Sequence, residues 1–199
     1  MPPKLIGNLE KGIVFVLSAP AGTGKTTLSQ MICQEYKGHI VESISCTTRE
    51  KREHEKNGVH YHFLSDSEFQ TKVQNHEFLE YVHVFDHSYG TLKSEITSKI
   101  QKGIHVILVI DTQGAMKIKK MIDAVYIFLA PPSIEELERR LKFRQTETDS
   151  MIKKRLEWAE KEMSYAEHYD YFIINEDLQI AYQVLKSIVI AEEHRNRLS

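Results

Sequence analysis

The apolar positions of the chain fall into two patterns that alternate along its length. Short continuous apolar runs, typical of strands buried on both faces, occupy 13–17, 104–110, 125–129 and 171–174. Each is followed by apolar residues spaced for one face of a helix, as at Leu28, Met31, Ile32 and Tyr36 after the first run. Strands that alternate with helices predict an α/β fold, with a parallel sheet covered by helices on both faces.

The segment between the first helical pattern and the second apolar run differs from the rest. It predicts short strands at 39–45, 59–63 and 78–85, and a helix capped by Ser65. Residues 46–58 are polar and predict a loop, with Asn57-Gly58 as a turn signal. Residues 86–91 also predict a turn. The segment therefore indicates a small β-rich insert in the parallel core.

Composition narrows the class of protein. A chain of 199 residues with 41% hydrophobic residues and a net charge of −2 predicts one ordinary soluble domain. The absence of a basic excess argues against a general nucleic-acid binder. No apolar run reaches membrane-spanning length, and the polar stretch 1–12 does not fit a signal peptide. The two cysteines, outside any CxxC pair, are expected to be reduced thiols in a cytoplasmic protein.

Ten histidines raise the question of a metal site. His60 and His62 alternate on one predicted strand face, but no His-x₃-His or Cys/His cluster accompanies them. Scattered surface histidines are the better interpretation, and no dedicated histidine metal site is predicted.

The first apolar run leads into a glycine-rich turn and then a helix. The turn fits the phosphate-binding pattern G-x-x-x-x-G-K-[ST], except that Ala19 takes the first position. The first N–H groups of a helix lack internal partners and carry partial positive charge, so they bind anions. Lys25 would reach the β- and γ-phosphates of a nucleotide, and the Thr26 hydroxyl would bind Mg²⁺. The alternative is a plain strand-to-helix turn. The predicted nucleotide site comprises Ala19, Pro20, Ala21, Gly22, Thr23, Gly24, Lys25, Thr26 and Thr27.

With this turn placed, further motifs follow in an order that resembles the guanylate kinase family from Ile13 to about Ala191. The most specific are Thr47-Thr48-Arg49 with Arg52, Gly58 to Phe63, Phe78-Leu79-Glu80, and Arg144-Gln145-Thr146-Glu147. The resemblance implies a P-loop kinase fold that converts ATP and GMP to ADP and GDP with Mg²⁺, in purine nucleotide metabolism and GMP recycling, and that also accepts dGMP. It implies one domain, 1–199, with a core (12–37, 92–130, 166–199), a GMP-binding lobe (38–91) and a helical lid (131–165).

The resemblance also assigns residues to GMP. It places Glu80 on the guanine base, where one carboxylate accepts hydrogen bonds from N1–H and N2–H₂ together, an arrangement that adenine cannot satisfy. The residues matched to the GMP phosphate are Arg49, Arg52, Tyr61 and Tyr89, and those matched to further guanine contacts are Ser45, Thr91 and Asp111. Without the resemblance, the arginines read as a solvated basic loop, Glu80 as an exposed strand residue and Thr91 as a helix cap.

For the transfer step, the resemblance places cations around the migrating phosphoryl group. They are Lys25, Arg140, Arg144 and Arg155, the last three from the lid. Asn175 matches a position beside the ATP base. Glu136 and Arg140 lie four residues apart, so a simple ion pair on a helix surface is the alternative for Arg140.

Three other functions compete with this interpretation. A non-catalytic guanylate-kinase-like module that binds protein partners would be expected to lose the lysine or glycines of the turn, and both are present. A related P-loop kinase that acts on a sugar phosphate is disfavoured by Ser45, Glu80 and Asp111. A GTPase would explain Asp111-Thr112-Gln113-Gly114, but no Asn-Lys-x-Asp motif follows.

Overall fold

The apolar runs form the main sheet. The computed structural model describes residues 4–84, 86–143 and 148–196. Within them, five parallel strands lie in the order β2-β7-β1-β8-β9. Their bounds are β1 (Val14–Ser18), β2 (Ile40–Glu42), β7 (His105–Val109), β8 (Val125–Ala130) and β9 (Tyr171–Ile174). The parallel core predicted from the alternation of strands and helices is confirmed.

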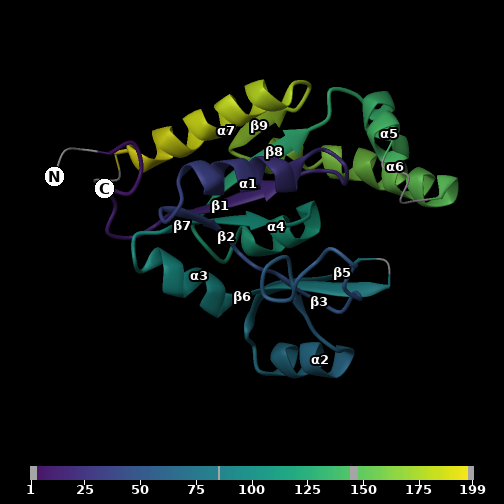
Figure 1. Cartoon of the computed structure of the whole chain (residues 1–199), viewed down its shortest axis with the longest axis horizontal. Helices are drawn as coiled ribbons and strands as arrows, with labels where there is room; N and C mark the ends of the chain where they lie inside the picture. Colours follow the sequence, from purple (N-terminus) through teal and green to yellow (C-terminus); the bar gives the residue numbers. More distant parts are fainter. Residues whose placement is uncertain (1–3, 85, 144–147, 197–199) are drawn as a thin grey trace.

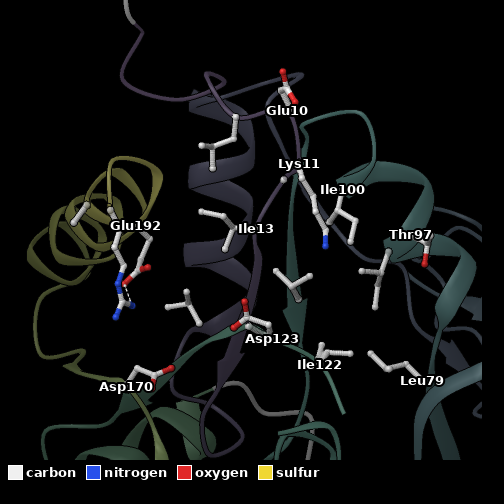
Figure 2. Close-up of a pocket in the computed structure, with 18 of the residues that line it drawn as sticks. Glu10, Lys11, Ile13, Leu79, Thr97, Ile100, Ile122, Asp123, Asp170 and Glu192 are labelled. Atoms are coloured by element: carbon white, nitrogen blue, oxygen red, sulfur yellow. Dashed lines mark hydrogen bonds and ion pairs between the residues drawn. The ribbon is translucent and has the colours of Figure 1, made fainter. Parts of the chain in front are cut away.

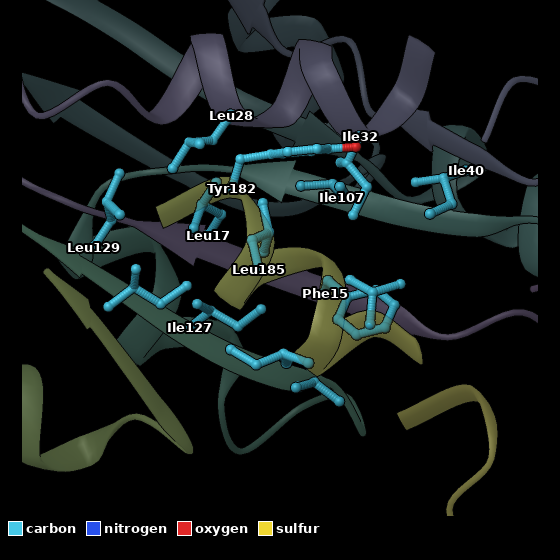
Figure 3. Close-up of a cluster of buried hydrophobic side chains, with 14 of the residues drawn as sticks. Phe15, Leu17, Leu28, Ile32, Ile40, Ile107, Ile127, Leu129, Tyr182 and Leu185 are labelled. Atoms are coloured by element: carbon cyan, nitrogen blue, oxygen red, sulfur yellow. The ribbon is translucent and has the colours of Figure 1, made fainter. Parts of the chain in front are cut away.

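Helices cover both faces of this sheet (Figure 1). On one face lie α1 (Lys25–Glu35) and α7 (Leu178–Glu193), and on the other lie α3 (Lys93–Ile100) and α4 (Thr112–Ile118). Strand β1 supplies both cores, because Phe15 and Leu17 point to the first face and Val14 and Val16 to the second. Figure 3 shows the first core, in which α1 and α7 side chains close over the sheet.

A second, smaller sheet lies beside the main one, with strand order β4-β3-β6-β5. Its strands are β3 (Cys46–Thr47), β4 (His62–Phe63), β5 (Phe78–Val84) and β6 (His87–Leu92), with α2 (Asp66–Gln74) packed against them. β3 and β4 are parallel, whereas the β3–β6 and β5–β6 pairs are antiparallel. Ser65 forms the expected capping box with Glu68 at the start of α2.

Three details of the insert differ from the sequence prediction. Residues 86–91 were predicted as a turn, but His87–Leu92 is a strand because it pairs with β5 on one side and β3 on the other. The predicted loop 46–58 begins with strand β3. Strand β2, placed with the insert by its position after residue 38, pairs with β7 in the main sheet. Tertiary pairing decides all three, because it makes strands of β3 and β6 and assigns β2 to the main sheet.

Two helices, α5 (Ile134–Phe143) and α6 (Asp149–Met163), lie side by side at one end of the molecule (Figure 1). Leu137 and Leu141 of α5 pack against Ile152 and Ala159 of α6 in a cluster of their own. The Ser133 hydroxyl accepts a hydrogen bond from the Glu136 amide at 3.1 Å and so caps the start of α5. A short 3₁₀ turn, η1 (Ala166–His168), leads back to β9. Residues 144–147, including Arg144, lie outside the described residues.

Among the helices that the structure describes, none combines the length and apolar character needed to cross a membrane.

Candidate active site

The glycine-rich turn between β1 and α1 adopts a shape that requires its glycines. Gly22 has φ of 93° and Gly24 has φ of 103°, in the left-handed region where a side chain is strained. A Cβ atom at Gly24 would also lie 2.7 Å from the Asn175 amide nitrogen. Gly24 is the N-cap of α1, so the first free N–H groups of that helix face the turn. The predicted strand, turn and helix N-terminus are therefore all present.

Internal hydrogen bonds hold this turn in place. The Thr23 hydroxyl donates to the Pro20 carbonyl oxygen at 2.8 Å, and the Lys25 ammonium donates to the carbonyl oxygens of Ala19 and Pro20. Ala19 and Thr23 are buried, whereas the Thr26 side chain is exposed at the start of α1. The lysine thus folds over the turn, beside helix N–H groups suited to an anion. The predicted set is completed by Ala21 and Gly22, which are half-buried, and by exposed Thr27.

Asn175 holds the glycine-rich turn in place through a hydrogen bond. Its side chain is 4% exposed, and its amide nitrogen donates to the Thr23 carbonyl oxygen at 2.6 Å. The residue directly follows β9, so the last strand of the sheet holds the turn that follows the first. The position of Asn175 beside the ATP base stays a prediction. Its hydrogen bond to the turn was not indicated by the sequence.

A second polar site lies where the small sheet meets the main one. Glu80 of β5 is 6% exposed, and its Oε1 accepts a hydrogen bond from the Thr91 hydroxyl on the paired strand β6 at 2.8 Å. Its Oε2 is buried and has no hydrogen-bond partner among the described residues. A Cβ atom at Gly114 would lie 2.9 Å from that oxygen and 3.3 Å from Asp111 Oδ1. The structure therefore brings Glu80, Thr91 and Asp111 together, as the sequence predicted.

Burial controls the charge of Glu80. Loss of solvent raises the pKa of the Glu80 carboxyl to about 7, and the nearby Asp111 carboxylate adds to this rise. The Thr91 hydrogen bond acts in the opposite direction. A buried carboxylate oxygen without a donor is costly, so this site is prepared for a ligand that supplies N–H groups. The interpretation of Thr91 as a helix cap is wrong, because α3 begins without a side-chain cap bond.

A third group of side chains comes from the loop between β3 and β4 and from strand β6. The Arg49 guanidinium donates to Glu55 Oε1 at 2.8 Å and stacks 5.5 Å from the centre of the Tyr61 ring. Tyr61 in turn contacts Tyr89 edge to face, with ring centres 6.2 Å apart. Arg49, Tyr61 and Tyr89 are therefore close together, whereas the Arg52 side chain is exposed to solvent.

Glu55 organises this loop, and the sequence did not single it out. It is 6% exposed, and its Oε2 accepts a hydrogen bond from the Arg52 backbone N–H at 2.8 Å. The hydrogen bond from Arg49 holds the pKa of the Glu55 carboxyl at about 2, so the group stays charged at neutral pH. Its position within a run of charged residues predicted solvation, and only the folded loop distinguishes it from its neighbours.

The remaining predicted residues are placed less directly. Ser45 precedes β3, and its carbonyl oxygen accepts a hydrogen bond from the His62 amide at 2.8 Å. Arg140 pairs with Glu136 at 2.8 Å, so the surface ion pair considered for it is present. Arg155 is half-buried on α6.

A hollow of about 1450 Å³ lies at the opposite edge of the sheet (Figure 2). It is lined near the starts of β1 and β8, by residues such as Lys11, Ile13 and Asp123, whereas the glycine turn follows the end of β1. None of the predicted site residues lines it. In parallel α/β sheets, ligands bind beyond the carboxyl ends of the strands, so the hollow is not the nucleotide site.

A parallel sheet whose first strand leads through a glycine-rich turn into the N-terminus of a helix is the arrangement of the P-loop kinase fold. A sequence model of the guanylate kinase family matches residues 11–192. The chain belongs to the guanylate kinase family.

Individual relatives agree with this assignment. A guanylate kinase of Protochlamydia amoebophila is 53% identical over 189 residues, which cover 95% of each chain. One of Chlamydia trachomatis serovar D is 49% identical over 182 residues, covering 92% of this chain and 89% of the relative. The crystal structure of a guanylate kinase from Anaplasma phagocytophilum superposes with a TM-score of 0.78 at 35% identity, covering 94% of this chain and 88% of that one.

Proposed function

We propose that this chain transfers the γ-phosphoryl group of ATP to GMP, or to dGMP, in purine nucleotide metabolism in the cytoplasm. The observation that carries the choice of acceptor is Glu80. One of its oxygens is held by Thr91, and the other is buried without a partner among the described residues. A guanine base supplies the two adjacent N–H donors that this carboxylate lacks. The similarity to guanylate kinases over most of the chain does not favour the sugar-phosphate and protein-binding alternatives.

The pocket favours guanine over adenine through a difference in hydrogen bonding. Guanine N1–H and N2–H₂ both donate, so one ionised carboxylate satisfies both. Adenine would present a lone pair to a buried oxygen, which leaves the charge unpaired and costs about 1–3 kcal/mol or more. Sites that hydrogen-bond a substrate in this way discriminate by roughly 10⁴. Ser45 and Asp111 are proposed as further contacts of the base.

The loop around Arg49 suits the phosphate of GMP. Arg49, Tyr61 and Tyr89 are already in contact, and Arg52 lies on the same loop. A guanidinium binds phosphate oxygens through paired N–H groups. The acceptor phosphate has its second pKa near 6 and is largely ionised at neutral pH, so the transfer needs no general base. A phosphate oxygen of GMP attacks the γ-phosphorus of ATP while the bond to the β-phosphate oxygen breaks and ADP leaves.

The remaining task is to hold two anions in line and to neutralise them. The turn from Ala19 to Thr27 would bind the phosphates of ATP through helix N–H groups, with Asn175 holding its shape. Lys25 would contact the transferring group, and Arg140, Arg144 and Arg155 would approach from a lid formed by 131–165. Closure of this lid over residues 38–91 and the core would exclude water, which otherwise competes as acceptor.

The residues of the turn fit a magnesium ion. The exposed Thr26 hydroxyl is an oxygen ligand beside the phosphate-binding turn. Among the described residues, no group of three His, Cys, Asp or Glu side chains could hold a metal ion. Mg²⁺ in kinases is held mainly by substrate phosphates, waters and one or two protein oxygens, so Thr26 is sufficient as the protein ligand. When bound, the ion neutralises charge on the phosphates.

A coupled assay of ADP release tests this proposal. The purified chain is given ATP with GMP, dGMP, AMP, UMP or a sugar phosphate, each with and without Mg²⁺. We expect ADP release that requires Mg²⁺ and either GMP or dGMP. Equal turnover with AMP would contradict the role of Glu80, and turnover only with the sugar phosphate would contradict the proposal as a whole.

The loop contacts predict the effect of removing the charge of Glu55. In Glu55→Gln, Arg49 loses its ionised partner, so the phosphate-binding loop is less well ordered before GMP arrives. We expect the KM for GMP to rise about tenfold, equivalent to about 1.4 kcal/mol, with little change in the KM for ATP. Steady-state kinetics measure both constants. The exposed neighbour provides the control Glu53→Gln, and an unchanged KM for GMP in Glu55→Gln would contradict the prediction.

A further inference from the structure

A further buried acid, Glu162, lies near the P-loop lysine, and the proposed mechanism does not use it. Glu162 is in the last turn of α6 and is 4% exposed. Its Oε1 accepts a long hydrogen bond, 3.4 Å, from the Thr112 hydroxyl. Burial raises the pKa of the Glu162 carboxyl to about 7. A buried carboxyl group costs free energy unless it is compensated by partners, so its place at this junction needs an explanation.

The surroundings of Glu162 connect three parts of the site. Thr112 is the first residue of α4 and directly follows Asp111, whose Oδ1 accepts a hydrogen bond from the Gly114 amide at 2.7 Å. The Lys25 ammonium favours the charged form of Glu162, and Asp111 opposes it. Glu162, near the end of the proposed lid, is therefore close to the P-loop lysine and to the start of α4.

The position of Glu162 along α6 is equally informative. Ile152, Ala159 and Glu162 are buried and Arg155 is half-buried, which places all four on the inner stripe of the helix. Arg155 precedes Glu162 by seven residues, about two turns or roughly 10 Å along the helix axis. A contact that holds Glu162 in place therefore also sets the rotation of α6 about its axis and the distance of Arg155 from the core.

We propose that Glu162 is a positioning residue for the phosphoryl transfer, which holds the base of α6 against Thr112 so that Arg155 reaches the transferring group. The inference rests on the proposed function and adds a residue to that site. Glu162 touches neither nucleotide and acts through Arg155. Because a displacement of about 1 Å in a group at the reacting centre can cost roughly a hundredfold in rate, a loose base of α6 lowers kcat rather than GMP binding.

A double-mutant cycle tests this coupling. Steady-state kcat and KM are measured for the wild type, Glu162→Ala, Arg155→Ala and the double variant, with Glu160→Ala as a control from the exposed face of α6. We expect Glu162→Ala to lower kcat by roughly thirtyfold to a hundredfold with little change in the KM for GMP. The double variant is expected to be no slower than Arg155→Ala, since Glu162 has nothing left to position. Glu160→Ala should match the wild type.

Two conservative variants keep the test decisive if Glu162→Ala does not fold. Glu162→Gln retains an oxygen that accepts from Thr112 and is expected to keep most of kcat. Thr112→Val removes that donor at nearly constant volume and is expected to lower kcat in the same direction as Glu162→Ala. Thermal unfolding of each variant shows which of them are folded.

Several results would overturn the proposal. Losses in Glu162→Ala and Arg155→Ala that multiply in the double variant would show that Glu162 does not act through Arg155. A folded Thr112→Val or Glu162→Ala with wild-type kcat would exclude the anchoring contact. Absence of GMP-dependent turnover in the wild type itself would contradict the proposed function, and this inference with it, so the two failures are distinguishable.

Discussion

Lys25→Ala is expected to lower the kcat of GMP phosphorylation by about a thousandfold, because it removes the cation of the P-loop from the transferring phosphoryl group. The affinity for GMP should stay nearly unchanged, since the guanine pocket around Glu80 and the loop around Arg49 do not involve the lysine side chain. Single-turnover kinetics measure the chemical step, and calorimetry with GMP alone measures binding.

The contacts of Lys25 within the turn require a control. Its ammonium donates to the carbonyl oxygens of Ala19 and Pro20, so its removal also takes away bonds that hold the turn. Lys25→Met keeps the packing of the aliphatic stem but loses both the ammonium charge and these hydrogen bonds, and it should lose turnover to a similar extent. Lys102→Ala removes an exposed lysine elsewhere and should behave as the wild type. A Lys25→Met enzyme with normal kcat would refute the role of the charge.

Glu80→Gln is expected to change which purine is phosphorylated. A glutamine amide offers one acceptor and one donor, which no longer matches the two N–H donors of guanine but does match N6–H and N1 of adenine. We expect kcat/KM for GMP to fall by about a hundredfold to a thousandfold and kcat/KM for AMP to rise, both measured in the coupled assay. Glu50→Gln, at an exposed position, is the control. An unchanged ratio of GMP to AMP turnover in Glu80→Gln would contradict the assignment.

The same residue predicts how GMP binding depends on pH. Guanine requires the ionised carboxylate, and burial raises the pKa of Glu80 to about 7 in the free protein. Binding is therefore strongest above pH 7, and below it a proton must be released, so the Kd should rise up to about tenfold per pH unit. The second pKa of the GMP phosphate is near 6, and its titration affects binding to the wild type and to Glu80→Gln alike. Glu80→Gln should consequently lose only the part of the pH dependence that lies nearest neutral pH.

Local chemistry explains what could be predicted from the sequence. Strands β1, β7 and β8 lie almost entirely within apolar runs, and they were recognised because a strand covered on both faces has few polar positions to confuse the pattern. The P-loop was recognised for a similar reason, since its glycines are required by the backbone of the turn itself, as the φ angles of Gly22 and Gly24 show.

The features that were missed depend on distant partners. Strand β6 contains polar and turn-forming residues and becomes a strand only between β5 and β3. Gly90 lies in it where a Cβ atom would be 2.9 Å from the Phe78 ring. Glu55 and Glu162 both lie among charged residues, which predicts solvated surface. Their burial arises from contacts with Arg49 and Thr112 that no local pattern contains.

The hydrogen bond from Asn175 to Thr23 makes the conformation of the P-loop depend on a distant part of the chain. The two residues are 152 positions apart, so a stretch of sequence that looks self-sufficient is completed by the far end of the chain. A fragment that ends before β9 would contain every residue of the phosphate-binding motif but would lack this hydrogen bond. The phosphate-binding conformation of the turn therefore depends on the docked last strand, and it belongs to the folded domain rather than to the motif alone.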